Sequence, residues 1–218
     1  MANPTRKIDK THLSIDNAEQ RGFLHRDYIA HCLRWTHVVK YLAQQQRYKT
    51  ARILDIGCGK EIPMAKLMHS SRMEPTAYYA VDVNNLVLPD QFKNAKWKPR
   101  LAGKVDVCDL KSTDFEEGPP NIISCFEVLE HVAPEHSRRM LEKIYELLEP
   151  EGVAFISTPC WDPQVGAANN HINEMTYYAL GSMIEDVGLA IEGRWGTFAS
   201  IKDYKDELTM AQKEVFDD

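Results

Sequence analysis

The stretch Ile53-Leu54-Asp55-Ile56-Gly57-Cys58-Gly59 decides the fold of this chain. Its first four residues are mostly apolar and too few for a helix, which is typical of a buried strand, and the two glycines then mark a tight turn. A short helical pattern follows at residues 63–69. A buried strand, a glycine turn and a helix, in this order, predict the first unit of a parallel β-sheet covered by helices.

The same alternation of strands and helices continues toward the C-terminus. Strands are predicted at 77–85, ending in Asp82, at 104–110, ending in Asp109, within 121–132, where a strand ending near Phe126 runs into a helix, and at 153–159. Helices are predicted at 137–152 and 176–188, and 189–200 is compatible with a further pair of strands. This pattern predicts an α/β protein with a Rossmann-like, doubly wound, mostly parallel sheet and helices on both faces.

The region before the first strand has a different pattern. Apolar residues recur at three- and four-residue steps from Ile15 to Gln46, which predicts helix. We therefore expect an N-terminal helical extension at 1–50, one α/β domain at 51–200 and a polar tail at 201–218.

Composition narrows the classes of protein to which this chain can belong. The formal net charge of −6 leaves a polyanionic partner unsupported without excluding it, and no apolar run approaches the roughly 20 residues of a membrane span. The five cysteines are scattered without a CxxC pair, so neither a disulfide framework nor a zinc knuckle is expected. No apolar stretch follows the basic residues near the N-terminus, so we expect a cytoplasmic protein. Nothing in the sequence indicates an oligomeric state.

Ligand-binding residues are expected where the strands end. In an open α/β sheet, ligands bind outside the carboxyl ends of the strands, which singles out the glycine turn, Asp82 and Asp109. Glycines allow a ligand to approach the backbone closely. An acid after the second strand suits the hydroxyls of a ribose, and one after the third can accept a hydrogen bond from an adenine amine.

The ordered motifs LDIGCG, AVDVNN and VCDL resemble those of the class I S-adenosylmethionine-dependent methyltransferases, over roughly Ile53 to Ser200. The resemblance implies S-adenosylmethionine as cofactor, with Asp55 and the glycine turn at its methionine part, Asp82 at the ribose, and Cys108 and Asp109 at the adenine. The full set of cofactor residues that it implies is Asp55, Gly57, Cys58, Gly59, Asp82, Val83, Cys108, Asp109 and Phe126. Lys60-Glu61 stand where the family more often has a third glycine, and Ile62 breaks the GxGxxG pattern of dinucleotide enzymes.

The second informative stretch is FEVLEHV, residues 126–132. Glu127 should stand at the tip of the fourth strand, with Glu130 and His131 in the helix that follows. Two close carboxylates in an apolar context repel one another, so a positive partner is expected. Mg²⁺ or Mn²⁺ suits such oxygen and imidazole ligands, and His171 in the loop NNHINEMT would supply a fourth ligand.

This pattern resembles a narrower group, the metal-dependent O-methyltransferases that act on the 3′-terminal ribose of small RNAs or in the ubiquinone pathway. The resemblance implies that Glu127, Glu130, His131 and His171 hold the metal and form the catalytic centre. The predicted function is methylation of a hydroxyl oxygen, on a small molecule or on a nucleoside or nucleic-acid end. Two alternatives stay open: a metal-independent methyltransferase with His131 as general base, and a non-catalytic cofactor-binding scaffold.

Overall fold

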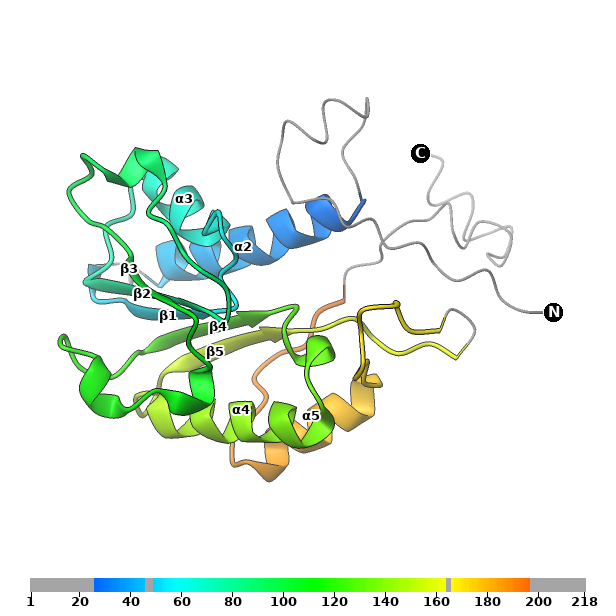
Figure 1. Ribbon diagram of the computed structural model, residues 1–218. Coiled ribbons are helices and arrows are strands. Elements are labelled where there is room, and N and C mark those ends of the chain that lie inside the picture. Colours follow the sequence, from blue (N-terminus) through cyan, green and yellow to red (C-terminus); the bar gives the residue numbers. More distant parts are fainter. Residues whose placement is uncertain (1–25, 46–48, 164–165, 197–218) are drawn as a thin grey trace. The chain divides into compact units, whose positions relative to one another are not determined.

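The computed structural model describes residues 26–45, 49–163 and 166–196 (Figure 1). The chain divides into two compact units, one of Met1–Ile8 and Trp35–Glu192, the other of Asp9–Arg34 and Gly193–Asp218. The sheet and all the site residues discussed below lie in the first unit. The three-part division expected at 1–50, 51–200 and 201–218 stays a prediction, because 1–25 and 197–218 lie outside the described residues.

The first unit is built on one five-stranded parallel sheet. Its strands are β1 (Arg52–Ile56), β2 (Ala77–Asp82), β3 (Arg100–Gly103), β4 (Ile122–Phe126) and β5 (Val153–Ser157). They lie side by side in the order β3-β2-β1-β4-β5, and every neighbouring pair is parallel. The predicted Rossmann-like α/β fold is therefore confirmed.

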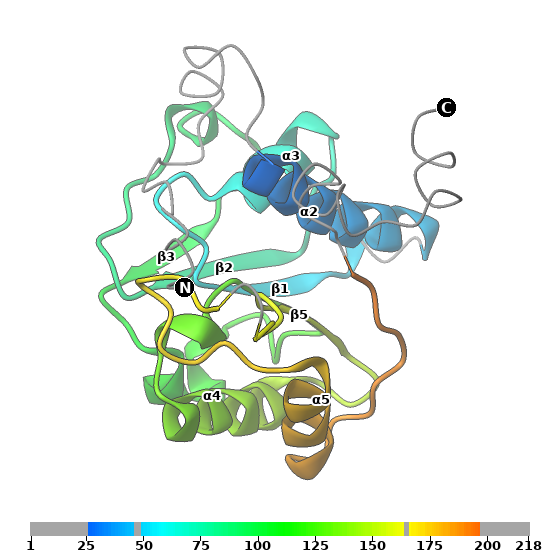
Figure 2. The same ribbon diagram turned by 90° about the vertical axis from the view of Figure 1, so that its right-hand side faces the viewer.

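Helices cover both faces of this sheet (Figures 1 and 2). From Trp35 onward, α2 (Arg26–Gln44) packs on one face with α3 (Pro63–Ser70), while α4 (Pro134–Leu147) and α5 (Tyr177–Asp186) pack on the other. Neighbouring residues of β1 alternate between the two cores: Ile53 joins the α2–α3 side and Leu54 the α4–α5 side, both with 0% exposure. Burial on both faces explains why β1 is apolar almost throughout.

The strand order places a switch point between β1 and β4. From β1 the chain passes through α3 to β2 and on to β3 in one direction, whereas β4 leads through α4 to β5 in the other. The loops that leave β1 and β4 therefore diverge to opposite faces, which opens the ligand-binding crevice typical of such sheets. The glycine turn follows β1 and FEVLEHV begins at the end of β4.

The predicted third strand at 104–110 is wrong. The strand is β3, Arg100–Gly103, and Asp109 lies instead in a 3₁₀ turn, η3 (Val107–Asp109). The carboxylate of Asp106 accepts the amide of Cys108 at 2.9 Å, which offers the backbone an alternative to sheet pairing. The alternation of polar and apolar residues at 104–110 resembles a strand, but this local hydrogen bond closes a turn.

The helix after FEVLEHV and the strand pair expected near the end of the described chain also differ from expectation. The helix after FEVLEHV begins at Pro134 and ends at Leu147, and residues Leu129–His131 form a separate 3₁₀ turn, η5. Pro134 favours an extended residue before it, and Ala133 is extended. No strand forms at 189–196, the described part of the expected strand pair. The expected N-terminal helix corresponds to α2, with its first part, 15–25, outside the described residues.

None of the helices in the described ranges is both long and apolar enough to span a membrane.

Candidate functional site

The glycine turn after β1 requires its two glycines. Gly57 and Gly59 have φ angles of 66° and 68°, in the left-handed region that side chains disfavour. The amides of Gly57 and Cys58 both donate to the carbonyl of Val81, at 2.8 and 3.3 Å. The turn is thereby fixed to the end of β2.

The two glycines have different surroundings. A Cβ on Gly57 would lie 2.3 Å from Cγ2 of Val128, so the turn packs directly against the segment that follows β4. A Cβ on Gly59 would meet nothing within 4 Å. The side of the turn at Gly59 is therefore open to a ligand.

Asp82 at the end of β2 is tied to this turn. Its carboxylate accepts the amide of Gly59 at 3.0 Å on one oxygen, and the amide and side chain of Asn84 at 2.8 and 2.9 Å on the other. Asp82 is only 8% exposed, whereas the next residue, Val83, is 69% exposed. The carboxylate thus lies at the open side of the turn and holds the backbone there.

Asp55 lies beneath the turn rather than at its open side. It is buried, and it accepts hydrogen bonds from the hydroxyls of Tyr78 at 2.6 Å and Ser124 at 2.7 Å. Burial raises the pKa of Asp55 to about 6, against the lowering effect of these two hydrogen bonds. Burial likewise raises the pKa of Cys58, so this thiol stays neutral and packs as an apolar group.

The residues expected at the adenine, Cys108 and Asp109, lie in η3. Cys108 is half-buried, Asp109 is exposed, and Asp106 accepts the Cys108 amide. Asp106 also lies 2.7 Å from Nε2 of His136 on α4. Sequence reasoning passed over Asp106 and His136, although an acid two residues before a turn residue is a typical capping pattern. The last predicted cofactor residue, Phe126, ends β4 and packs against the α2–α3 core.

Glu127 begins the turn after β4 in a strained conformation. Its φ angle of 56° is uncommon for a residue with a side chain. Its amide donates to the carbonyl of Ser157 and its carboxylate accepts from the Ser157 hydroxyl, both at 2.9 Å. These two bonds hold Glu127 toward the end of β5.

Glu130, His131 and His171 come together in one cluster. One ligand atom from each lies within 4.8 Å of the others. Glu130 is 1% exposed, and one of its carboxylate oxygens accepts from the Thr158 hydroxyl at 3.1 Å while the other lies 3.7 Å from Nε2 of His131. Of the four metal ligands expected from the sequence, the structure brings these three together and leaves Glu127 outside the cluster.

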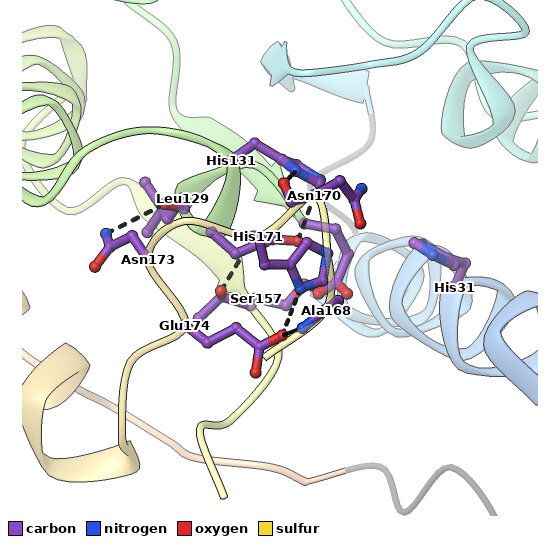
Figure 3. Close-up of polar contacts among 12 residues, drawn as sticks. His31, Leu129, His131, Ser157, Ala168, Asn170, His171, Asn173 and Glu174 are labelled. Carbon is purple, nitrogen blue, oxygen red and sulfur yellow. Dashed lines mark hydrogen bonds and ion pairs between the residues drawn. The ribbon is translucent and has the colours of Figure 1, made fainter. Parts of the chain in front are cut away.

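Both imidazoles are held by their Nδ1 atoms (Figure 3). Nδ1 of His131 lies 3.0 Å from the carbonyl of Asn170, and Nδ1 of His171 lies 2.6 Å from the carboxylate of Glu174. A carbonyl and a carboxylate only accept, so Nδ1 of each ring is the donor, and in the neutral ring Nε2 carries the lone pair. Metal-binding histidines are usually held in this way.

Backbone hydrogen bonds attach the His171 loop to η5. The carbonyl of Glu130 accepts the amides of Ile172 and Asn173, at 2.9 and 3.1 Å. The side chain of Asn173 donates to the carbonyl of Leu129 at 3.3 Å and to the hydroxyl of Ser137 at 2.9 Å. Sequence reasoning gave no role to the supporting residues Asn170, Asn173 and Glu174, although all three lie with His171 in the motif NNHINEMT.

A hollow of about 290 Å³ lies beside His171. It is lined by Trp161, Ala167, His171, Ile172, Asn173 and Glu174. The side chains of Trp161 and Ile172 are exposed, at 37% and 68%. The hollow therefore combines an apolar, partly aromatic wall with the imidazole of His171 and the carboxylate of Glu174.

Comparison with known proteins gives one family that spans most of the chain. The family described as "Methyltransferase domain" matches residues 25–212. Ubiquinone biosynthesis O-methyltransferase from Coxiella burnetii is 28% identical over 120 residues, which cover 55% of this chain and 48% of that protein. The mitochondrial protein of the same name from Saccharomyces cerevisiae is 30% identical over 107 residues, covering 49% of this chain and 33% of the relative. This chain matches about half or less of the length of these curated relatives.

Solved structures show the same fold. The magnesium protoporphyrin IX methyltransferase from Synechocystis PCC 6803, solved with bound SAH, superposes with a TM-score of 0.59 at 17% identity, over 78% of each chain. At this identity the likeness concerns the fold alone.

Proposed function

This chain belongs to the class I S-adenosylmethionine-dependent methyltransferase family, and on that premise we propose that it transfers a methyl group from S-adenosylmethionine to a hydroxyl oxygen. The observation that carries the proposal is the contact between the glycine turn after β1 and the segment after β4. Gly57 of the turn is in contact with Val128, which lies three residues before His131. A cofactor over the turn would therefore lie beside Glu130, His131 and His171.

The cofactor would be held by residues at the carboxyl ends of β1, β2 and β4 and in η3, which follows β3. We place its methionine part at the open side of Gly59 and its ribose at the carboxylate of Asp82, with Val83 beside it. The adenine would border Cys108 and Asp109, and Phe126 would lie beneath. Asp55 would support the cofactor site without touching the cofactor, because the hydroxyls of Tyr78 and Ser124 donate to it and so join the strands that carry the turn.

The Glu130-His131-His171 cluster fits a divalent ion. One ligand atom from each imidazole and one from the buried Glu130 carboxylate lie within 4.8 Å of one another, and each ring is oriented by a hydrogen bond at Nδ1. This mixed set suits Mn²⁺ at least as well as Mg²⁺, because imidazole binds Mn²⁺ more readily than it binds Mg²⁺. When bound, such an ion would lower the pKa of an acceptor hydroxyl and orient its oxygen. The carboxylate of Glu127 accepts a hydrogen bond from the Ser157 hydroxyl, and it would have to leave this hydroxyl to become a fourth metal ligand.

A metal-independent mechanism is the second candidate, and one observation favours it. The side chain of His131 is 40% exposed, and its Nδ1 proton is committed to the carbonyl of Asn170. Nε2 can then accept a proton from an acceptor hydroxyl, which is the role of a general base.

The acceptor we propose is a small hydroxylated molecule rather than a nucleic acid. The basic segment 93–104 is largely neutralised by ion pairs, of Lys93 with Asp90, Lys96 with Glu74, and Arg100 with Glu116. The hollow beside His171 has an aromatic wall, and two of the relatives are named for ubiquinone biosynthesis.

The test is direct binding followed by transfer. The full chain is titrated with S-adenosylhomocysteine by calorimetry, and then incubated with methyl-labelled S-adenosylmethionine and separate pools of phenols, vicinal diols, nucleosides and short RNAs, with Mn²⁺ or with EDTA. We expect cofactor binding, and transfer to the phenol or diol pool that Mn²⁺ stimulates. Equal transfer in EDTA would favour His131 as base. Cofactor binding without transfer to any pool would favour the scaffold, and transfer to RNA alone would overturn the small-molecule acceptor.

A further inference from the structure

We propose that Asp106, Cys108 and His136 form a second cation site, selective for Zn²⁺ or a similarly soft divalent ion. This site lies at the interface between η3 and α4. It shares no residue with the Glu130-His131-His171 cluster. Because Cys108 is also placed beside the adenine of the cofactor, the metal experiments below are made without cofactor.

The three ligand atoms are already close together. A carboxylate oxygen of Asp106, Sγ of Cys108 and a ring nitrogen of His136 lie within 4.8 Å of one another. Around a tetrahedral zinc ion with bonds of about 2.0–2.3 Å, neighbouring ligand atoms are roughly 3.3–3.8 Å apart. Small side-chain movements therefore suffice to bind an ion. All three side chains are half-buried, so solvent retains access to the fourth position.

The backbone preorganises two of these ligands. Asp106 accepts the amide of Cys108 on one oxygen at 2.9 Å, which leaves its second oxygen directed at Nε2 of His136, 2.7 Å away. The cap places Cys108 two residues beyond Asp106 on the tight turn η3, and His136 projects from the first turn of α4. An ion bound here would cross-link the two elements.

The donor set separates this site from the first cluster. A thiolate, an imidazole and a carboxylate with one open position match Zn²⁺ or Co²⁺, whereas the first cluster contains no sulfur. Burial, together with the hydrogen bond of Asp106, raises the pKa of the Cys108 thiol to about 11. A metal bound to Sγ would displace the thiol proton.

Arg139 is a built-in competitor for the metal. Its Nη2 lies 2.8 Å from Nδ1 of His136, so Nδ1 accepts and Nε2 carries the proton that faces Asp106. An ion bound to Nε2 of His136 requires the opposite tautomer, with the proton on Nδ1. Arg139 opposes that tautomer because its own N–H points at Nδ1, and its positive charge also repels the ion. Arg139 is exposed and can turn away. Removing it should tighten metal binding.

The experiment uses Co²⁺ as a spectroscopic probe on the full chain. Co²⁺ bound to a thiolate has a ligand-to-metal charge-transfer band in the near ultraviolet that carboxylate and imidazole ligands do not give. We expect this band in the unaltered chain, its displacement by Zn²⁺, and its loss in Cys108→Ser. His136→Gln should weaken Co²⁺ binding at least tenfold, and Arg139→Gln should tighten it several-fold.

Two controls complete the test. Cys160→Ser removes an exposed thiol elsewhere, and His171→Ala disrupts the first cluster, so both should keep the band. Absence of the band, or its survival in Cys108→Ser, would overturn the proposal. Looser binding in Arg139→Gln would also contradict it. Should Cys108→Ser fail to fold, unchanged Co²⁺ affinity in His136→Gln decides against the site.

Discussion

The imidazole rings of His131 and His171 meet edge to face, with centroids 4.8 Å apart and ring planes inclined at 76° (Figure 3). The first ring comes from the turn after β4 and the second from the long loop after β5. Their Nδ1 atoms are bonded to protein oxygens, and one ligand atom from each shares a cluster with the Glu130 carboxylate. Most of the predictions below concern this pair and the glycine turn next to it.

The first prediction concerns metal binding by the cluster. His171→Ala should weaken Mn²⁺ binding by at least tenfold, because one of two nitrogen ligands is lost, while the midpoint of thermal unfolding without metal should change little. Glu174→Gln should weaken Mn²⁺ binding roughly 10- to 100-fold, because the ring of His171 loses its charged hydrogen-bond partner. Calorimetry with Mn²⁺ measures both. Glu135→Gln, an exposed carboxylate in the first turn of α4, is the matched control and should bind normally. Equal Mn²⁺ affinity in all these variants would return His171 to a role in the loop alone.

The second prediction contrasts the two glycines of the turn. Gly57→Ala should lower the free energy of unfolding by about 2–5 kcal/mol, because the left-handed φ costs about 1–2 kcal/mol and its new Cβ would overlap Val128. Gly59→Ala should lower the free energy of unfolding by only about 1–2 kcal/mol, because the new Cβ would have no neighbour within 4 Å. Yet Gly59→Ala should impair S-adenosylhomocysteine binding strongly, because the open side is where we place the cofactor. Urea unfolding and calorimetry separate the two effects, and normal binding by Gly59→Ala would move the cofactor elsewhere.

The third prediction concerns Asp82. Asp82→Asn should weaken S-adenosylhomocysteine binding by roughly 10- to 100-fold, because ribose hydroxyls would lose a charge-assisted acceptor that contributes about 1.5–3 kcal/mol. The asparagine can still accept the amide of Gly59, so the turn should persist. Asp90→Asn, an exposed acid beyond β2, is the control. An unchanged dissociation constant in calorimetry would remove Asp82 from the cofactor site.

The fourth prediction is a pH dependence of stability that originates at Asp55. Burial raises its pKa in the folded protein from 3.8 to about 6, so the folded state binds a proton more readily than the unfolded state. The stability contributed by this protonation is complete below about pH 4 and is lost as the pH rises through 6. Over that window it amounts to roughly 3 kcal/mol.

Asp55→Asn removes this titration. Relative to the unaltered chain, the variant should gain about 2 kcal/mol in the free energy of unfolding when the pH is raised from about 4.5 to about 7.5. Urea unfolding at the two pH values measures the difference. Ser112→Ala, on an exposed turn, should show no such change. A difference between Asp55→Asn and the unaltered chain that does not vary with pH would show that Asp55 does not titrate in this range.

The predicted fold was confirmed where apolar runs were long and bounded by breakers. β1, β2, β4 and β5 and the helices near 63–70 and 177–186 agree with expectation. Burial on both faces gives β1, β2 and β4 a plain apolar signature, whereas β5 is a half-buried edge strand. The third strand was misplaced because β3 is a short, half-exposed edge strand, while a side-chain cap at Asp106 turned the more strand-like stretch after it into η3. Short edge strands carry little burial signal in their sequence.

The candidate site was predicted in part. The residues at the strand ends and the pairing of Glu130 and His131 with His171 followed from motifs and from their resemblance to known families. The turn of Glu127 toward Ser157 and the hydrogen bonds of Asn170 and Glu174 to the two imidazoles did not. A side chain's direction depends on backbone conformation and on neighbours from other strands, and neither is present in a local motif.

By itself, the sequence determined the doubly wound sheet, the glycine turn after its first strand and the acids that follow the strands, because hydrophobic period and the conformational freedom of glycine are local properties. Only the tertiary structure decided which groups meet: Gly57 against Val128, Asp82 on the amide of Gly59, His171 beside His131, and His136 facing Asp106. These contacts join distant segments through the parallel register of the strands and the packing of α4 on the sheet. Their chemistry therefore arises from the position of each strand in the sheet and not from spacing along the chain.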